Sequence, residues 1–128
     1  MALEPFQYAV IRVVPRIERE EFVNVGVIVF CRTRGYLGVR LDYDPARVRA
    51  LAPEAELTGV PEYLDAIARI AAGEREAGPI AELPQSERFG WLAAPSSTIV
   101  QTSDVHTGLS EDPELTLDRL FEQLVARQ

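Results

Sequence analysis

The sequence predicts an α+β fold: an antiparallel sheet of about four strands, a three-stranded meander plus a later strand, with the helices packed on one face. Three observations lead to this prediction. The longest apolar run, 21–31, is rich in β-branched residues, as in a central strand. Shorter apolar segments flank it at 6–14 and 36–43. An aspartate–proline pair, which typically begins a helix, occurs at 44–45 and again at 112–113.

The first two strands predict a hairpin. The strand 6–14 ends before Pro15, which has no N–H to donate inside a sheet. Only a short charged connection separates it from 21–31, so the two segments pair most simply in antiparallel fashion. This pairing places Arg12 and Asn24 at similar depths in the sheet.

The remaining strands complete the sheet. A turn at 32–35 leads to the third strand, 36–43, which alternates between apolar and polar residues. Gly26 and Gly38, inside strands, predict a bulge or close packing by a neighbour. The fourth strand, 96–103, is rich in hydroxyl side chains, so it should lie near an edge or line a groove.

Three segments predict helices. The first covers about 45–51, and the second runs from about 61 to 72 and stops at Gly73. The third follows Pro113 and should lie across one face of the sheet, because its apolar residues recur at helical spacing. Between the second and third helices, glycines and prolines make 74–95 an irregular connecting segment with one helical turn near its end. The whole chain, 1–128, is expected to be one domain.

The charge balance restricts the classes of partner. The chain has 13 arginines and no lysine against 20 acidic residues, for a net charge of −7. This acidic balance argues against broad nucleic-acid binding, which needs a positive surface. Residues 1–52 hold eight arginines and six acids, and 53–128 hold five arginines and fourteen acids. A small anionic ligand would therefore meet the first half, unless the two halves neutralise each other on one folded surface.

The cysteine content and the hydropathy of the sequence restrict the cellular compartment and the kinds of site. Cys31 is the only cysteine, so it cannot form a disulfide within the chain and should pack as a small apolar group. The N-terminus has no signal-peptide pattern and no window is apolar enough to cross a membrane, which predicts a soluble, cytoplasmic protein. Asp42 and Asp44 are spaced to hold a hard cation, but capping of a helix explains Asp44 better. We expect no metal and no cofactor.

The candidate binding residues fall mainly in two segments. Asn24 is an amide in an apolar strand, so its side chain either makes a structural hydrogen bond or orients a ligand or partner. Arg88, Trp91, Ser96 and Ser97 combine a guanidinium, an indole and two hydroxyls, which suit a phosphate or carboxylate attached to a flat group. For Trp91, as for its neighbour at 89, we favour packing in the core. For the two serines we favour the start of a strand over a nucleophilic role.

The remaining candidates are basic. His106 is the only histidine, which excludes sites built on two imidazoles. It is a weak candidate for a catalytic acid or base, oriented by Asp104 if the segment is extended. Arg12 and Arg19 could join Arg88 in holding an anionic substrate. No confident catalytic residue and no phosphate-binding or dinucleotide-binding motif is present.

Two stretches of the chain resemble a known family. The first consists of YAVIRVVP (8–15) and EFVNVGVIVFC (21–31). The second consists of RFGWLAAPSS (88–97), followed by DP (112–113) and LDRLF (117–121). Together they resemble the bacterial family catalogued as domain of unknown function 3037, over nearly the whole chain. The resemblance implies no catalytic residue. It does imply short bacterial proteins that can be encoded beside kinases of the HipA-like type.

These observations leave two main functional hypotheses and a weaker third, nucleic-acid recognition through the arginine-rich first half. The first is an accessory or regulatory domain that binds a partner protein, through the sheet edge or a groove near Arg88 and Trp91, with a HipA-like kinase as one partner implied by the resemblance. The alternative is a small enzyme or ligand-binding domain for an anionic substrate, held by the three arginines with His106 as acid or base.

Overall fold

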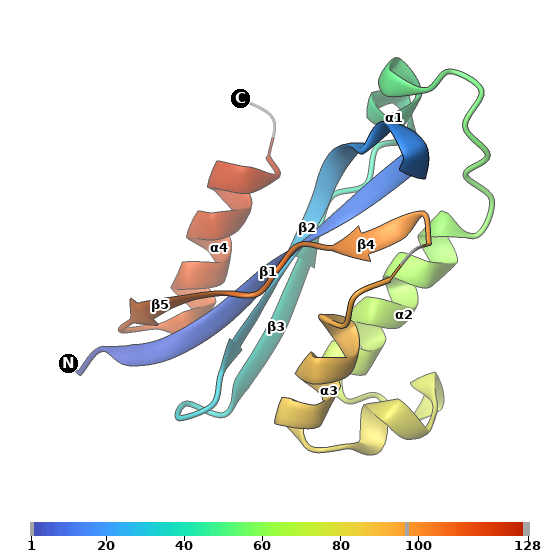
Figure 1. Cartoon of the computed structure of the whole chain (residues 1–128). Coiled ribbons are helices and arrows are strands. Elements are labelled where there is room, and N and C mark those ends of the chain that lie inside the picture. The colour runs from blue at the N-terminus through green and yellow to red at the C-terminus, as the bar shows by residue number, and fades with distance from the viewer. Residues whose placement is uncertain (1, 97, 127–128) are drawn as a thin grey trace.

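The computed structural model describes residues 2–96 and 98–126 and has the α+β fold predicted from the sequence (Figure 1). Short 3-10 segments lie at Ile17–Arg19, Arg75–Ala77 and Pro79–Glu82. The main elements are β1 (Glu4–Arg16), β2 (Glu21–Cys31), β3 (Tyr36–Leu41), α1 (Pro45–Leu51), α2 (Val60–Ala72), α3 (Gln85–Leu92), β4 (Val100–Thr102), β5 (His106–Ser110) and α4 (Pro113–Leu124).

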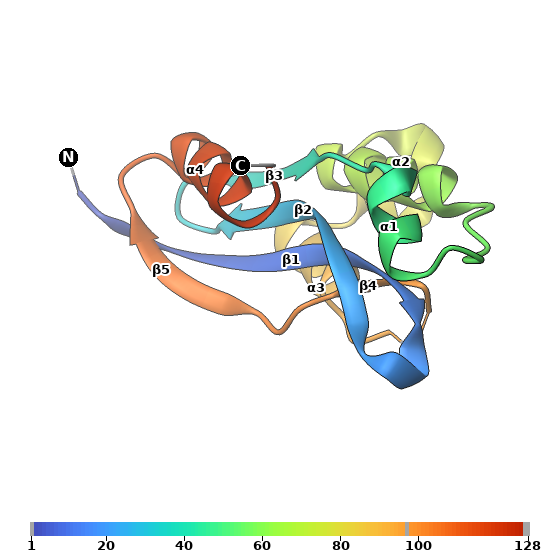
Figure 2. The same ribbon diagram turned by 90° about the horizontal axis from the view of Figure 1, so that it is seen from above.

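The sheet is antiparallel throughout and is built around β1 and β2. Its order is β3-β2-β1, and β4 and β5 share the remaining edge of β1. The predicted meander is therefore present, with β2 in its middle. The later strand differs in detail: 96–103 was expected to be one strand, whereas β4 covers only its end and β5 continues along the same edge (Figure 2). The described chain thus has five strands rather than about four.

A serine joins β4 to β5 without leaving a gap in the ladder. The register pairs Ile11 with Thr102 and Tyr8 with His106, which leaves one extra residue on the outer strand. At this bulge the N–H of Ser103 donates to the carbonyl of Val10, and the N–H of Val10 donates to the hydroxyl of Ser103, both at 2.8 Å. The hydroxyl therefore replaces the backbone acceptor that the bulge removes.

A second bulge, in β2, changes which face its first residues point to. Ile11 pairs with Gly26 but Arg12 pairs with Asn24, so one residue of β2 is extra and the side chains beyond it change face. The glycine is required by packing: a Cβ at position 26 would lie 2.5 Å from Cδ2 of Leu41 and 2.8 Å from a backbone carbonyl of β3. The bulge and close packing predicted at Gly26 are both confirmed.

The helices lie on both faces of the sheet, whereas the sequence predicted one. In Figure 1, α4 lies on one side of the sheet, and α2 and α3 lie on the other. The two sides have separate cores, and β2 contributes to both because its side chains alternate between the two faces. On the α4 side β2 contributes Val27, Val29 and Cys31; on the α1–α3 side it contributes Val23, Val25, Ile28 and Phe30.

The predicted helix starts are confirmed. The carboxylate of Asp44 accepts from the N–H of Ala46 at 2.9 Å, and that of Asp112 accepts from the N–H of Glu114 at 3.0 Å, each before a proline in the first turn. The segment 74–95 is more ordered than expected. It contains two short 3-10 segments and the helix α3, which has about two turns in place of the one that was predicted.

Candidate functional site

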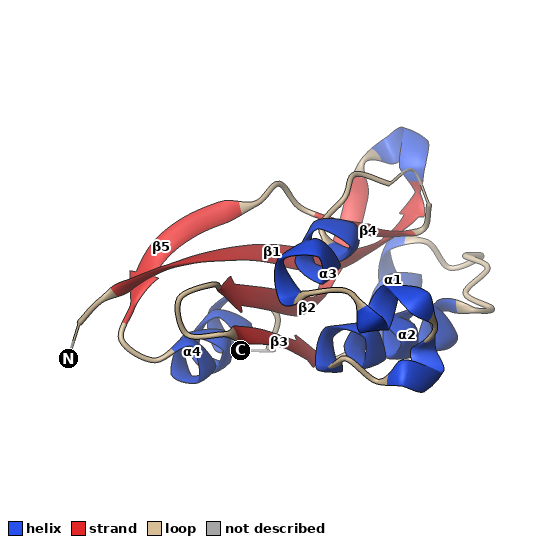
Figure 3. Ribbon diagram, turned by 90° about the horizontal axis from the view of Figure 1, so that it is seen from below, coloured by secondary structure: helices blue, strands red, loops and turns tan. Residues whose placement is uncertain are grey.

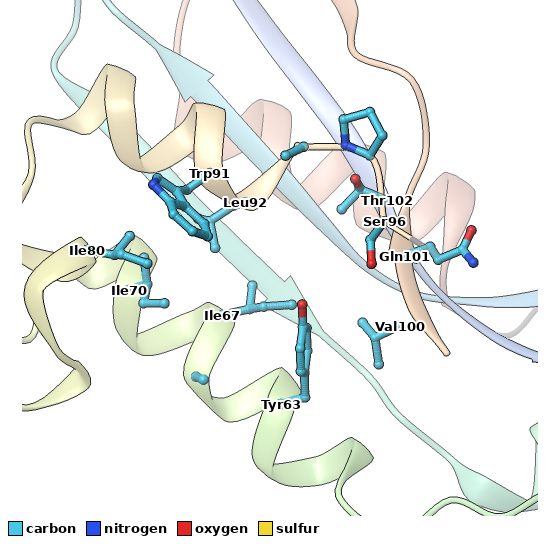
Figure 4. A pocket seen from close by; sticks show the side chains of 13 residues that line it. Tyr63, Ile67, Ile70, Ile80, Trp91, Leu92, Ser96, Val100, Gln101 and Thr102 are labelled. Carbon is cyan, nitrogen blue, oxygen red and sulfur yellow. The ribbon is translucent and has the colours of Figure 1, made fainter. Parts of the chain in front are cut away.

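A groove on the α1–α3 face lies between α2, α3 and β4. Its volume is about 350 Å³, and its walls are mostly apolar. Figure 4 shows Trp91 and Leu92 extending from α3 toward Ile67 and Ile70 of α2. Ile67 is buried at the floor of the groove, because it also belongs to the core on this face. The groove is lined by Tyr63, Ile67, Ile70, Ile80, Trp91, Leu92, Ser96, Val100 and Thr102, among others.

Trp91 lies on the rim of this groove and is 61% exposed. The preference for core packing was correct for Phe89, which is buried and stacks on Phe30 with the ring centroids 5.2 Å apart. It was wrong for Trp91. Residues two apart on an α-helix point to nearly opposite sides, so a helix that buries Phe89 turns Trp91 outward. The sequence predicted only one helical turn here, which was too short to show that Trp91 points away from the core.

Besides Tyr63 of α2, the polar groups of the groove come from the hydroxyl-rich segment before and within β4. The hydroxyl of Thr98 lies 2.9 Å from that of Ser96 and donates to the carbonyl of Val100 at 2.7 Å. The hydroxyl of Thr102 is buried and has no hydrogen-bond partner within the described chain. Ser97, the other serine predicted for binding, lies outside the described residues. Sequence reasoning placed Thr102 in a strand that lines a groove but did not single it out.

Acidic side chains lie on the surface near the groove but do not line it. Glu62 and Asp65 border a separate hollow beside α2, and Glu87 borders another beside Trp91; all three are exposed and make no ion pair within the described chain. Two arginines of the same region are paired, Arg69 with Glu74 and Arg75 with Glu82. The unpaired charges of this surface are therefore mainly negative.

Arg88 lies behind the groove and not in it. It is only 9% exposed, and its Nη1 donates to the last carbonyls of α2, Ile70 at 3.3 Å and Ala71 at 3.4 Å. Gly73 allows this contact, because a Cβ there would lie 2.5 Å from Nη1, and its φ of +76° suits glycine. Arg88 thus joins the end of α2 to α3 and holds the two helical walls of the groove together.

The structure brings Arg12 and Asn24 together on the opposite face of the sheet. They are directly paired across β1 and β2, as predicted. The guanidinium carbon of Arg12 lies 4.2 Å from the ring centroid of Phe22, and its Nε is buried without a partner in the described chain. Asn24 Nδ2 donates to the carbonyl of Leu124, at the end of α4, at 3.1 Å. Asn24 therefore makes the structural hydrogen bond that was one of its two expected roles.

We expect Asn24→Ala to lower the free energy of unfolding by about 1–2 kcal/mol, because the carbonyl of Leu124 would lose its donor in a partly buried position. Urea denaturation followed by circular dichroism measures this change. Gln123→Ala, on the exposed side of α4, is the control and should stay within about 0.5 kcal/mol of the wild type. Equal stability of the two variants would contradict a structural role for Asn24.

Arg19 and His106 lie in separate places. Arg19 is exposed beside the hairpin and donates to Glu21, a hydrogen bond that raises the pKa of Arg19 and lowers that of Glu21. His106 is exposed on the α4 face, with its ring centroid 5.1 Å from that of Tyr8. No hydrogen bond joins it to Asp104 among the residues that the structure describes. Arg12, Arg19, Arg88 and His106 thus make their contacts in four different places.

Among residues 2–96 and 98–126, no group of three or more His, Cys, Asp or Glu side chains is placed to hold a metal ion. Within the same residues, no helix combines the length and the apolar character needed to cross a membrane.

Comparisons with known proteins give one match. Residues 8–125 match the model of a family described as protein of unknown function (DUF3037). No curated protein and no solved structure matches the chain.

Proposed function

The chain belongs to the DUF3037 family of proteins of unknown function, and from this premise we propose that it is an accessory domain that binds a partner protein through the Trp91 groove. The observation that carries the proposal is the exposure of Trp91 beside an apolar hollow. Burial of so large an apolar side chain against a partner is favourable, and tryptophan is enriched among the residues that dominate binding energies. Apolar walls with a few polar groups are also typical of binding sites.

The charges around the groove indicate the chemistry of the partner. Glu62, Asp65 and Glu87 lie on the surface outside the apolar groove and carry no ion pair within the described chain. A partner segment with an aromatic or aliphatic anchor flanked by lysine or arginine would complement both features.

This proposal predicts a direct optical signal, because Trp91 is the only tryptophan. Random peptides displayed on phage are selected on the wild-type protein, and the best sequence is synthesised and titrated. We expect selected peptides to carry an apolar anchor with basic flanks and to move the Trp91 emission to shorter wavelengths as the indole leaves water. Trp91→Ala should weaken binding, measured by calorimetry, about tenfold or more.

The matched control is Leu115→Ala, which removes a side chain that is 65% exposed on α4, away from the groove. It should leave the affinity unchanged within about twofold, since it is outside the proposed contact. Selected peptides that bind Trp91→Ala as tightly as the wild type, or a selection that enriches no sequence, would contradict the proposal.

A HipA-like kinase is the first natural partner to test. Its support is the family resemblance alone, which links such kinases to this family in bacterial genomes. The same emission shift and the same two variants apply when the purified kinase from the organism of origin replaces the peptide. A partner role for the kinase requires that Trp91→Ala weaken its binding and that Leu115→Ala does not.

The alternative, an anionic substrate held by Arg12, Arg19, Arg88 and His106, has less support. Arg88 already donates to two carbonyls, and Arg19 donates to a carboxylate. Arg12 and His106 both lie on the α4 face, but their backbones are separated along β1 by about 13 Å at the usual rise of a strand. No observation therefore favours a shared substrate site for these four residues.

A further inference from the structure

Two exposed aromatic side chains line the Trp91 groove. Trp91 is 61% exposed, and Tyr63 is 49% exposed. Figure 3 shows that α2, which carries Tyr63, and α3, which carries Trp91, are neighbouring helices away from α4. In Figure 4, Tyr63 lies at the end of the groove beside Val100, and Trp91 lies at the other end beside Ile80. The groove therefore presents one large ring at each end.

The spacing of the two rings follows the α2 wall of the groove. This wall runs from Tyr63 through Ile67 to Ile70, on one face of the helix. An α-helix rises about 10 Å over the seven positions from the first of these residues to the last. A polyproline II helix rises about 3.1 Å per residue with three residues per turn, so its residues i and i+3 point the same way about 9 Å apart. On one face of a β-strand the spacings are about 7 and 13 Å, which match the wall less well.

The hydrogen-bonding groups of the groove suit a segment that has carbonyls but few N–H groups. Neither the hydroxyl of Tyr63 nor the indole N–H of Trp91 has a hydrogen-bond partner within the described chain. An indole only donates, so it needs an acceptor. The hydroxyls of Ser96 and Thr98, in contrast, are bonded to each other, and Thr98 also donates to the carbonyl of Val100. Proline supplies a carbonyl and has no N–H to satisfy, whereas the carbonyls inside an α-helix are already bonded within the helix.

An acidic residue lies outside the groove near each ring. Glu62 precedes Tyr63 in α2, and Glu87 lies one helical turn before Trp91 in α3 and borders the same small hollow. Both carboxylates are exposed and have no ion pair within the described chain. A lysine or arginine just outside the central part of a bound segment would therefore be attracted at either end.

We propose that the partner segment bound in the Trp91 groove is a proline-rich polyproline II helix, with prolines i and i+3 packed on the two rings and a basic residue at a flank. This inference rests on the proposed function, because it assigns the chemistry of the segment that occupies the same groove. Grooves lined by aromatic side chains bind such segments well, since the polyproline II helix is formed before binding and loses little conformational entropy.

Two libraries of random peptides displayed on phage distinguish a proline-rich segment from other segments. In one library, prolines are fixed at two positions three apart; in the other, proline is excluded from every position. Both libraries are selected on the wild-type protein, and the best peptide of each is synthesised and titrated by calorimetry. We expect the proline library to give the tighter ligand, with a dissociation constant at least tenfold lower.

Substitution of each ring tests the two contacts. Trp91→Ala and Tyr63→Ala should each weaken the best proline peptide about fivefold or more, because each removes the surface on which one proline packs. Both side chains are exposed on helices, so alanine should leave the fold intact, which circular dichroism checks. Leu115→Ala, on α4, is the control and should change the affinity less than about twofold.

The outcomes separate this inference from the proposed function. Proline-free peptides that bind as tightly as the proline peptides, and that Trp91→Ala weakens, would leave the groove as a binding site but overturn a polyproline II partner. An affinity for the proline peptide that Tyr63→Ala does not change would also overturn it, because the second proline would then have no ring. If neither library enriches a sequence, the proposed function fails together with this inference.

Discussion

Replacement of Arg88 by alanine should lower the free energy of unfolding by about 2–4 kcal/mol. The guanidinium is buried and supplies the donor for two carbonyls at the end of α2. Alanine would leave both carbonyls without this donor and would open a cavity between α2 and α3. The estimate is below the cost of breaking a complete buried ion pair, because the Nε of Arg88 has no partner in the described chain. Chemical denaturation measures the change directly.

The control for this prediction is Arg75→Ala. Arg75 is close in sequence and also contacts an oxygen, but its side chain is 84% exposed and its partner is the surface carboxylate of Glu82. Exposed pairs contribute little, so this variant should lose less than about 1 kcal/mol. Similar losses in the two variants would refute the buried role of Arg88. The prediction also affects binding studies: loss of partner binding in Arg88→Ala would report unfolding of the groove walls rather than a lost contact.

Gly26→Ala should lower the free energy of unfolding by about 2–3 kcal/mol, although it adds a single methyl group. The new Cβ would lie 2.5 Å from Cδ2 of Leu41 and 2.8 Å from the carbonyl oxygen of Arg40, in the middle of the sheet. The leucine side chain can turn aside, but the backbone carbonyl belongs to the ladder between β2 and β3 and cannot move freely. Thermal and urea denaturation should both show the loss.

Gly90→Ala makes the same chemical change with the opposite expected sign. Position 90 is exposed within α3, and a Cβ there would have no neighbour within 4 Å. Alanine is the better helix former, so this variant should gain about 0.5–1 kcal/mol. The prediction for Gly26 fails if both variants change stability in the same direction.

Local sequence patterns were sufficient to predict the meander and the helix caps. The hairpin of β1 and β2 follows from two apolar runs with a short connection, and the caps follow from the Asp44 and Asp112 motifs. The contact of Asn24 with α4 could not be predicted, because the face that Asn24 takes depends on the bulge before Gly26. The presence of a bulge could be inferred from a glycine, but the residue at which the side chains change face depends on the pairing with β1.

The candidate site was predicted only in part, for a similar reason. The groove near Trp91 and the strand after Ser96 were both anticipated, since aromatic and hydroxyl-bearing residues cluster there. The role of Arg88 was not anticipated. Its acceptors are backbone carbonyls of α2, and every residue type has such a carbonyl, so the sequence does not indicate them. The exposure of Trp91 likewise depends on the full length of α3.

The position of β1 between early and late strands also matters while the chain is being made. β2 follows β1 directly in the sequence and pairs with one edge of β1. The other edge of β1 is paired much later: Ser103 lies 93 positions after its partner Val10. On the ribosome, β1 therefore emerges and pairs on one side while its second row of N–H and C=O groups stays open through synthesis of α1, α2 and α3. The nascent chain is thus most vulnerable to aggregation until β4 and β5 have been translated.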